Sequence, residues 1–208
     1  GDGITKENLK TVEDDFLKLL KNLSNIFKKR KFLFGNRPSI ADIGFSGPFF
    51  RHFALDPIPL EIIRQKAPHV LCWVSNLWNA RVSKIDDDFE EGIPKDLEPL
   101  FRAIGKVYLP YLSANVDAVK QNKTKFDFKF GNVYLKNARY SLYRVWCLKE
   151  LRDRFTKLSE EDKTQVEILL KEYGCWEPLW RDKNLPLMDN QEEDLPFRAD
   201  RKMLGVNE

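Results

Sequence analysis

Hydrophobic positions recur every three or four residues in the first part of the chain, between Thr5 and Lys29. This period places apolar side chains on one helical face and charged side chains on the other. The apolar face consists of Leu9, Val12, Phe16, Leu19, Leu20, Leu23, Ile26 and Phe27. The pattern predicts an amphipathic helix over residues 5–29.

A second helical pattern begins at Ser39 and runs over residues 40–53. Ser39 and Asp42 have the S-x-x-D spacing of a capping box, in which each side chain satisfies a backbone N–H at the start of a helix. The helix is apolar nearly all round, through Ile40, Ile43, Phe45, Phe49, Phe50 and Phe53. We therefore expect a buried central helix. Ser39 is interpreted as a structural cap, because no G-x-S-x-G motif surrounds it to make it a nucleophile.

The rest of the chain predicts further helices. A helix is expected to begin near Pro68, and a long one over residues 93–122 should be kinked or jointed at Pro110. Two more follow, over residues 138–155 and 159–173, the second behind another S-x-x-D motif at Ser159.

Between these helices the period of the pattern changes to two. Phe126, Phe128 and Phe130 alternate with polar residues and are followed by Gly131-Asn132, which suits a two-residue hairpin turn. The predicted fold is therefore all-α: a helical bundle with a small β-hairpin insertion. We expect one domain over residues 1–180 and an extended tail, rich in Pro, Asp and Glu, over residues 181–208.

Charge and cysteine content narrow the classes of function. The net charge is only +3 and both signs are interleaved, so no nucleic-acid partner is expected. No apolar run reaches the length of a membrane span, so no membrane partner is expected. The three cysteines are widely spaced without a C-x-x-C pair, which favours reduced thiols in the cytoplasm over disulfides or zinc. The acidic run of residues 86–91 is interpreted as a solvated linker rather than a magnesium site, and no residue is assigned to a metal.

The stretch FLFGNRPSIADIGF, residues 32–45, resembles the C-terminal helical domain of the glutathione transferase superfamily. In that family a helix leads into an F-L-x-G turn, and S-x-A-D then starts the central helix. The matching residues are Phe32, Leu33, Gly35, Ser39, Ala41 and Asp42. Residues 97–100 and 140–148 resemble a bacterial-type branch of uncertain substrate.

The resemblance implies a partner domain. In the family, glutathione binds mainly to an N-terminal thioredoxin-like domain, which supplies the thiol-activating residue; that domain is expected to be missing from this chain. No catalytic residue is therefore assigned, and glutathione is expected only in the full-length protein. The first helix should face a missing neighbour through Leu9, Phe16, Leu20 and Phe27, which a second copy in a homodimer, the tail or nothing would cover.

Two functions follow from the resemblance. In one, the chain is the helical half of a glutathione-transferase-like protein, not catalytic on its own, that shapes a hydrophobic-substrate site. Its expected lining residues are Phe49, Phe53, Tyr108 and Tyr111, which are aromatic and lie near a predicted bend or helix end; plain core packing is the alternative for each. In the other, the chain is a non-catalytic docking module of the same superfamily.

Overall fold

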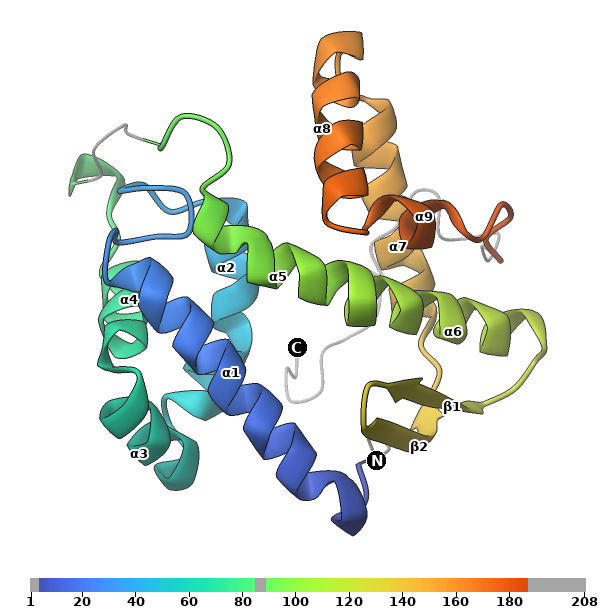
Figure 1. Cartoon of the computed structure of the whole chain (residues 1–208), viewed down its shortest axis with the longest axis horizontal. Coiled ribbons are helices and arrows are strands. Elements are labelled where there is room, and N and C mark those ends of the chain that lie inside the picture. The colour runs from blue at the N-terminus through green and yellow to red at the C-terminus, as the bar shows by residue number, and fades with distance from the viewer. Residues whose placement is uncertain (1–3, 85–88, 187–208) are drawn as a thin grey trace, which may run out of the picture. The chain divides into compact units, whose positions relative to one another are not determined.

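The structure of the chain is a computed structural model that describes residues 4–84 and 89–186 (Figure 1). It divides into two compact units: residues 9–101, called the N-terminal unit, and residues 1–8 with 102–208, called the hairpin unit. The predicted division between residues 1–180 and 181–208 stays a prediction. Most of the predicted tail, residues 187–208, lies outside the described residues, as does part of the acidic run, residues 85–88.

The described part of the N-terminal unit is mainly helical. They are α1 (Leu9–Phe27), α2 (Ile40–Pro48), the π-helical turn η2 (Phe49–Phe53), α3 (Pro57–Lys66), α4 (Pro68–Trp78) and the short 3-10 turns η3 (Val82–Lys84) and η4 (Lys95–Leu97). Its core is centred on Trp73 of α4, which is fully buried. The Phe27 ring stacks on Trp73 with ring centroids 4.8 Å apart, and Phe49 meets Trp73 edge-on at 5.4 Å.

The helix over residues 40–53 forms, but the expectation of a buried central helix holds for one of its sides only. Asp42, Ser46 and Phe49 point into the core, whereas Ile40 and Ile43 are 73% and 62% exposed. The residues that turn with the two isoleucines, Gly44 and Gly47, have no heavy atom near the position that a Cβ would take. The apolar composition of α2 therefore did not predict its burial, because one side of the helix has no neighbour within the N-terminal unit.

The expectation that the first helix faces a missing neighbour is wrong for two of its four residues. Leu20 and Phe27 are buried in the core of the N-terminal unit, where α1 packs against α4. Phe16 is half-buried against Phe53, with ring centroids 4.9 Å apart, and Leu9 is 56% exposed. Helix α4, which comes later in the chain than α1, covers the side of α1 that was expected to face a missing neighbour.

The hairpin unit begins within a helical run that continues from α5 (Glu98–Ala103) through the π-helical turn η5 (Ile104–Tyr108) into α6 (Leu109–Lys120). Pro110 lies two residues after the end of η5, so the predicted joint in the long helix is a π turn. The other helices are α7 (Leu142–Thr156), α8 (Glu160–Glu172) and α9 (Trp176–Trp180). The start predicted for α7, Ala138, is wrong because that residue lies in a strand.

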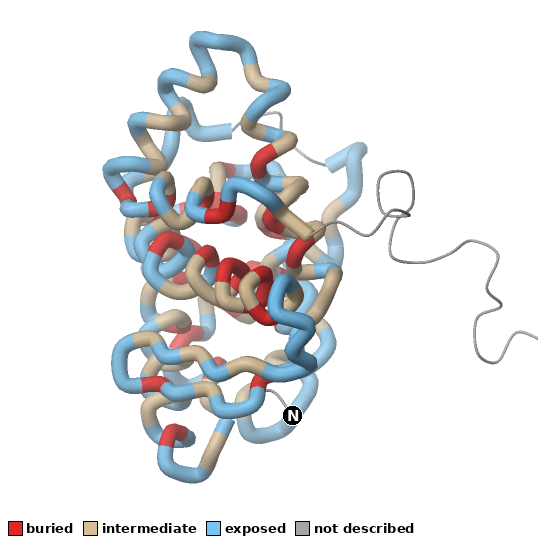
Figure 2. The backbone as a smooth tube through the Cα atoms, turned by 90° about the vertical axis from the view of Figure 1, so that its right-hand side faces the viewer, coloured by how far each residue is buried: buried red, intermediate tan, exposed pale blue. Residues whose placement is uncertain are grey.

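The predicted β-hairpin is confirmed. Strands β1 (Lys125–Phe130) and β2 (Val133–Arg139) pair antiparallel through a turn at Gly131, whose φ of 53° is in the left-handed region. Half-buried and exposed residues alternate along β1, as the period-two pattern indicated (Figure 2). Strand β1 packs against α6, where Tyr111 contacts the rings of Phe126 and Phe128 at 5.5 and 5.2 Å.

Helix α8 ends in a Schellman motif that fixes the path into α9. Cys175 N–H donates to Leu170 O (2.7 Å) and Gly174 N–H to Lys171 O (3.1 Å), while Gly174 has a φ of 71°. A Cβ built at Gly105 would lie 2.6 Å from the Gly174 carbonyl oxygen. Because Gly105 has no side chain, the backbone of η5 can lie directly against the backbone of this turn.

Candidate functional site

The Asp42 carboxylate connects three segments of the N-terminal unit. With Ser39 it forms a capping box, since Asp42 N–H donates to Ser39 Oγ (3.3 Å) and Ser39 N–H donates to Asp42 Oδ2 (2.9 Å). Its other oxygen, Oδ1, accepts from Leu33 N–H (2.9 Å) and from Trp73 Nε1–H (3.0 Å). The side chain is fully buried. All these hydrogen bonds serve the fold, so Ser39 and Asp42 have a structural role.

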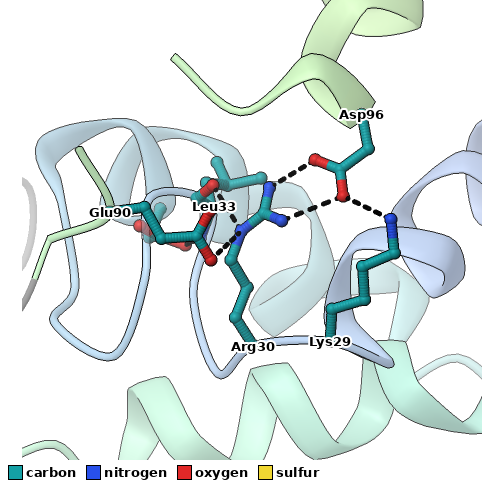
Figure 3. Close-up of polar contacts among 6 residues, drawn as sticks. Lys29, Arg30, Leu33, Glu90 and Asp96 are labelled. Carbon is teal, nitrogen blue, oxygen red and sulfur yellow. Dashed lines mark hydrogen bonds and ion pairs between the residues drawn. The ribbon is translucent and has the colours of Figure 1, made fainter. Parts of the chain in front are cut away.

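A second polar cluster surrounds the buried Arg30 side chain (Figure 3). Its guanidinium makes a two-pronged contact with Asp96, at 3.0 and 2.7 Å, and donates from Nε to Leu33 O at 2.9 Å. Lys29 Nζ reaches Asp96 Oδ2 at 3.1 Å, and Glu90 lies 3.9 Å from Arg30 Nε. The hydrogen bond from Arg30 keeps the pKa of Asp96 below its ordinary value. This cluster joins the turn after α1 to η4. The Arg30 guanidinium and the Asp96 carboxylate form hydrogen bonds within the cluster.

Two of the residues expected to line a substrate site lie in the interior of the N-terminal unit. Phe49 is 2% exposed, and Phe53 is half-buried between Phe16 and Phe49. Packing accounts for both rings, which is the alternative that the sequence left open. Their part in substrate binding stays a prediction.

The other two expected residues, Tyr108 and Tyr111, lie in the hairpin unit on the same helical run. Tyr111 is enclosed by the hairpin and by Arg144, whose guanidinium lies over its ring at 4.9 Å. Tyr108 is 43% exposed and lies near Tyr143 and Cys147 of α7. Of the four expected residues, Tyr108 is therefore the one with a clearly exposed ring.

Tyr108, Tyr143 and Cys147 form a group that we call the tyrosine–thiol cluster. Tyr143 and Cys147 lie close enough to interact electrostatically, and the Trp146 ring stacks on Tyr143 with ring centroids 5.5 Å apart. Burial, with the nearby Cys147 and Tyr143, raises the pKa of Tyr108, and Cys147 raises the pKa of Tyr143. Burial also raises the pKa of the Cys147 thiol, although Tyr143 and Arg144 oppose this.

These shifts keep all three groups protonated at neutral pH. A protonated thiol is a weak nucleophile, so the cluster lacks an activated attacking group. It offers aromatic faces and hydroxyl donors instead, which suit binding of an apolar or aromatic molecule. Sequence reasoning missed Tyr143 and Cys147, although both lie in the stretch 140–148 that carried part of the family resemblance.

The part of the chain that the structure describes offers no comparable set of residues for binding a metal ion. Within residues 4–84 and 89–186, no group of three or more His, Cys, Asp or Glu side chains could hold a metal ion. In the same ranges, every helix is too short or too polar to cross a membrane.

Comparison with known proteins decides the family of the first part of the chain. The family model for the glutathione S-transferase, C-terminal domain, matches residues 4–80, which include α1 to α4 and the capping box. Residues 4–80 form a glutathione S-transferase C-terminal domain. The predicted family resemblance and all-α fold are thereby confirmed, whereas the bacterial-type branch stays a prediction. Searches of curated proteins and of solved structures gave no match.

Proposed function

We propose that this chain is the hydrophobic-substrate half of a glutathione-transferase-like protein and is not catalytic on its own. The observation that supports this function is the tyrosine–thiol cluster, which presents exposed aromatic rings and hydroxyl donors without an activated nucleophile. Glutathione and the thiol-activating residue would come from a thioredoxin-like domain outside this chain. Within residues 4–84 and 89–186, Cys72 and Cys147 form no disulfide, which agrees with a reducing compartment such as the cytoplasm.

The first test is an activity assay of the chain with glutathione and a chlorodinitrobenzene-type electrophile. We expect no turnover above the uncatalysed rate, because no thiolate-stabilising donor is assigned within the chain. Addition of the thioredoxin-like domain of the full protein should restore conjugation. Turnover by the chain alone would show that it holds a catalytic group of its own.

The second test locates the substrate site by titrating the chain with an apolar aromatic ligand and following tryptophan fluorescence. Replacing Tyr108 or Tyr143 by alanine removes an aromatic face and should weaken binding about ten-fold. Tyr134→Ala is the matched control, because Tyr134 is 42% exposed, against 43% for Tyr108, but lies on β2. Equal losses in all three variants would mean that the ligand binds aromatic surface without a defined site.

The exposed side of α2 favours a second candidate function, that of a docking module. Ile40 and Ile43 present apolar surface beside two glycines, a combination that lets a partner approach the helix closely. Ile43→Lys would abolish partner binding in a docking module and leave the binding of the aromatic ligand unchanged. If the tyrosine variants bind the ligand as well as the wild type does, the docking function is the better account.

A further inference from the structure

Among the described residues of the hairpin unit, four buried polar atoms have no hydrogen-bond partner, and three of them lie together: Arg152 Nη2, Trp180 Nε1 and Asp182 Oδ2; the fourth is Ser113 Oγ. Arg152, Trp180 and Asp182 line a single pocket of about 450 Å³. Its other lining residues are Lys149, Asp153, Thr156, Lys183 and Leu185. Buried polar atoms are nearly always hydrogen-bonded, so two unused donors and one unused acceptor around one pocket need a common explanation.

Arg152 is the most unusual of the three. Arg152 is only 8% exposed. Its guanidinium donates from Nε to Leu179 O (2.8 Å) and from Nη1 to Asp182 O (2.6 Å). It lies over the Trp180 ring at 5.4 Å. Both protein acceptors are neutral carbonyls, so this part of the structure gives a buried cation no anion in direct contact. Burial accordingly lowers the pKa of Arg152, although the nearby Asp182 opposes this.

Neighbouring charges do not remove the need for an anion. Lys149 and Asp153 pair at 2.6 Å. The Oδ1 atom of Asp182 faces Lys120 at 3.7 Å and Arg181 at 3.3 Å, which leaves Oδ2 unused. The charge of Asp153 is thus balanced by Lys149, and that of Asp182 by Lys120 and Arg181. The positive charges of Arg152 and Lys183 remain unbalanced in the pocket. Such a pocket attracts a negatively charged group.

We propose that this pocket binds a small oxyanion, either a carboxylate or a phosphate. Arg152 Nη2 and Trp180 Nε1 donate hydrogen bonds to its oxygens, as guanidinium groups commonly do to planar or tetrahedral oxyanions. Asp182 Oδ2 accepts from a hydroxyl group next to the oxyanion on the same ligand. The site is therefore best suited to a small hydroxy acid or to the phosphate of a hydroxylated metabolite.

The three atoms are closed to water, so entry of a ligand requires a lining side chain to move. Lys183 is exposed, and its long side chain can change rotamer at low cost. Its ammonium then contributes to the charge that holds the ligand. This site does not depend on the proposed substrate function, because none of its residues belongs to the tyrosine–thiol cluster.

The test follows the indole N–H resonances of the full chain by NMR, with Trp180→Phe assigning the resonance of Trp180. Acetate, glycolate and inorganic phosphate are titrated separately at constant ionic strength, with chloride as the reference. We expect a saturable shift of the Trp180 indole and little change in the other four tryptophans. Tighter binding of glycolate than of acetate would identify the hydroxyl contact to Asp182, and tighter binding of phosphate would identify a phosphorylated ligand.

Variants separate the site from general surface charge. Arg152→Gln should weaken binding at least ten-fold, since it removes a charged donor to the ligand. Arg154→Gln is the control: it loses the same charge from the same helix, but Arg154 is exposed and already paired with Glu150, so affinity should stay within about two-fold. Asp182→Asn should remove the preference for glycolate over acetate. If Arg152→Gln does not fold, Trp180→Phe and Asp182→Asn decide the question by calorimetry.

The proposal is overturned if none of the three oxyanions gives a saturable shift of the Trp180 indole. It is equally overturned if Arg154→Gln weakens binding as much as the Arg152 variant does, because binding would then reflect diffuse charge. Activity measurements do not enter this test, so its outcome is independent of the chlorodinitrobenzene assay.

Discussion

A single carboxylate, that of Asp42, accepts hydrogen bonds from the turn before α2, from the start of α2 and from Trp73 of α4. An exposed version of the same motif occurs at α8, where Asp162 N–H donates to Ser159 Oγ at 3.1 Å. The spacing of Ser and Asp predicted a helix start in both places. It could not predict that one aspartate would also hold a buried indole, because that contact depends on a residue 31 positions away.

The two motifs make a matched pair of substitutions. Asp42→Ala leaves buried donors of Leu33 and Trp73 unsatisfied, and we expect it to lower the free energy of unfolding by about 3 kcal/mol or more. Asp162→Ala removes only the exposed hydrogen bond that Ser159 Oγ donates to the Asp162 carboxylate, since the cap itself uses the backbone N–H of residue 162, and it should cost about 1 kcal/mol or less. Urea denaturation followed by circular dichroism measures both. Similar losses in the two variants would contradict the linking role of Asp42.

The Arg30–Asp96 contact has a consequence that depends on pH. Arg30 keeps the pKa of Asp96 in the folded state below its unfolded value. The contribution to stability is therefore complete above the unfolded pKa, near 4, and is lost as the pH falls through the folded pKa. Wild-type stability should fall in this acidic range, and Asp96→Asn should flatten that part of the profile. Asp15→Asn, which breaks the exposed pair with Lys18, is the control and should leave the profile nearly unchanged.

At the scale of elements, the hydrophobic period predicted whether a segment is a helix or a strand better than it predicted which neighbours that segment contacts. The alternation of Phe126 to Phe130 gave the hairpin, and the cap at Ser159 gave α8, because each signal is local. The period could not say which side of α2 meets a neighbour, since its apolar residues surround the helix. Tyr108 was selected because it is aromatic and lies near a predicted joint. Its approach to Tyr143, which follows the hairpin in the sequence, depends on tertiary packing and could not be predicted.

The close approach of η5 to the turn after α8 can be tested with two glycines. Gly105→Ala would bring a Cβ to 2.6 Å from a backbone oxygen that cannot easily move, so we expect a loss of about 1–3 kcal/mol. Gly44→Ala is the control, because it adds a methyl group to α2 where nothing lies within 4 Å. That change should stabilise the helix by up to about 1 kcal/mol. Thermal unfolding of both variants gives the sign, and a stabilised Gly105 variant would contradict the close contact.

At the scale of the whole molecule, all residues of the main hydrophobic core come from the N-terminal unit itself. Its buried members run from Leu20 to Leu97, and the half-buried residues around them end at Phe101. The Asp42 and Arg30 clusters also lie within residues 29–96. The interactions that define this unit are therefore contained in residues 9–101, which include most of the matched C-terminal domain.

This containment predicts that residues 9–101 fold without the rest of the chain. A unit with its own core and satisfied buried polar groups can form a cooperative structure at this size. The fragment should show a helical circular dichroism spectrum and a single urea transition, and Asp42→Ala should lower its midpoint as it does in the full chain. Fluorescence gives a second readout, because the buried Trp73 should shift to longer wavelength only when the unit unfolds. A fragment that is disordered in buffer would mean that the hairpin unit supplies stability that the core of residues 20–97 lacks.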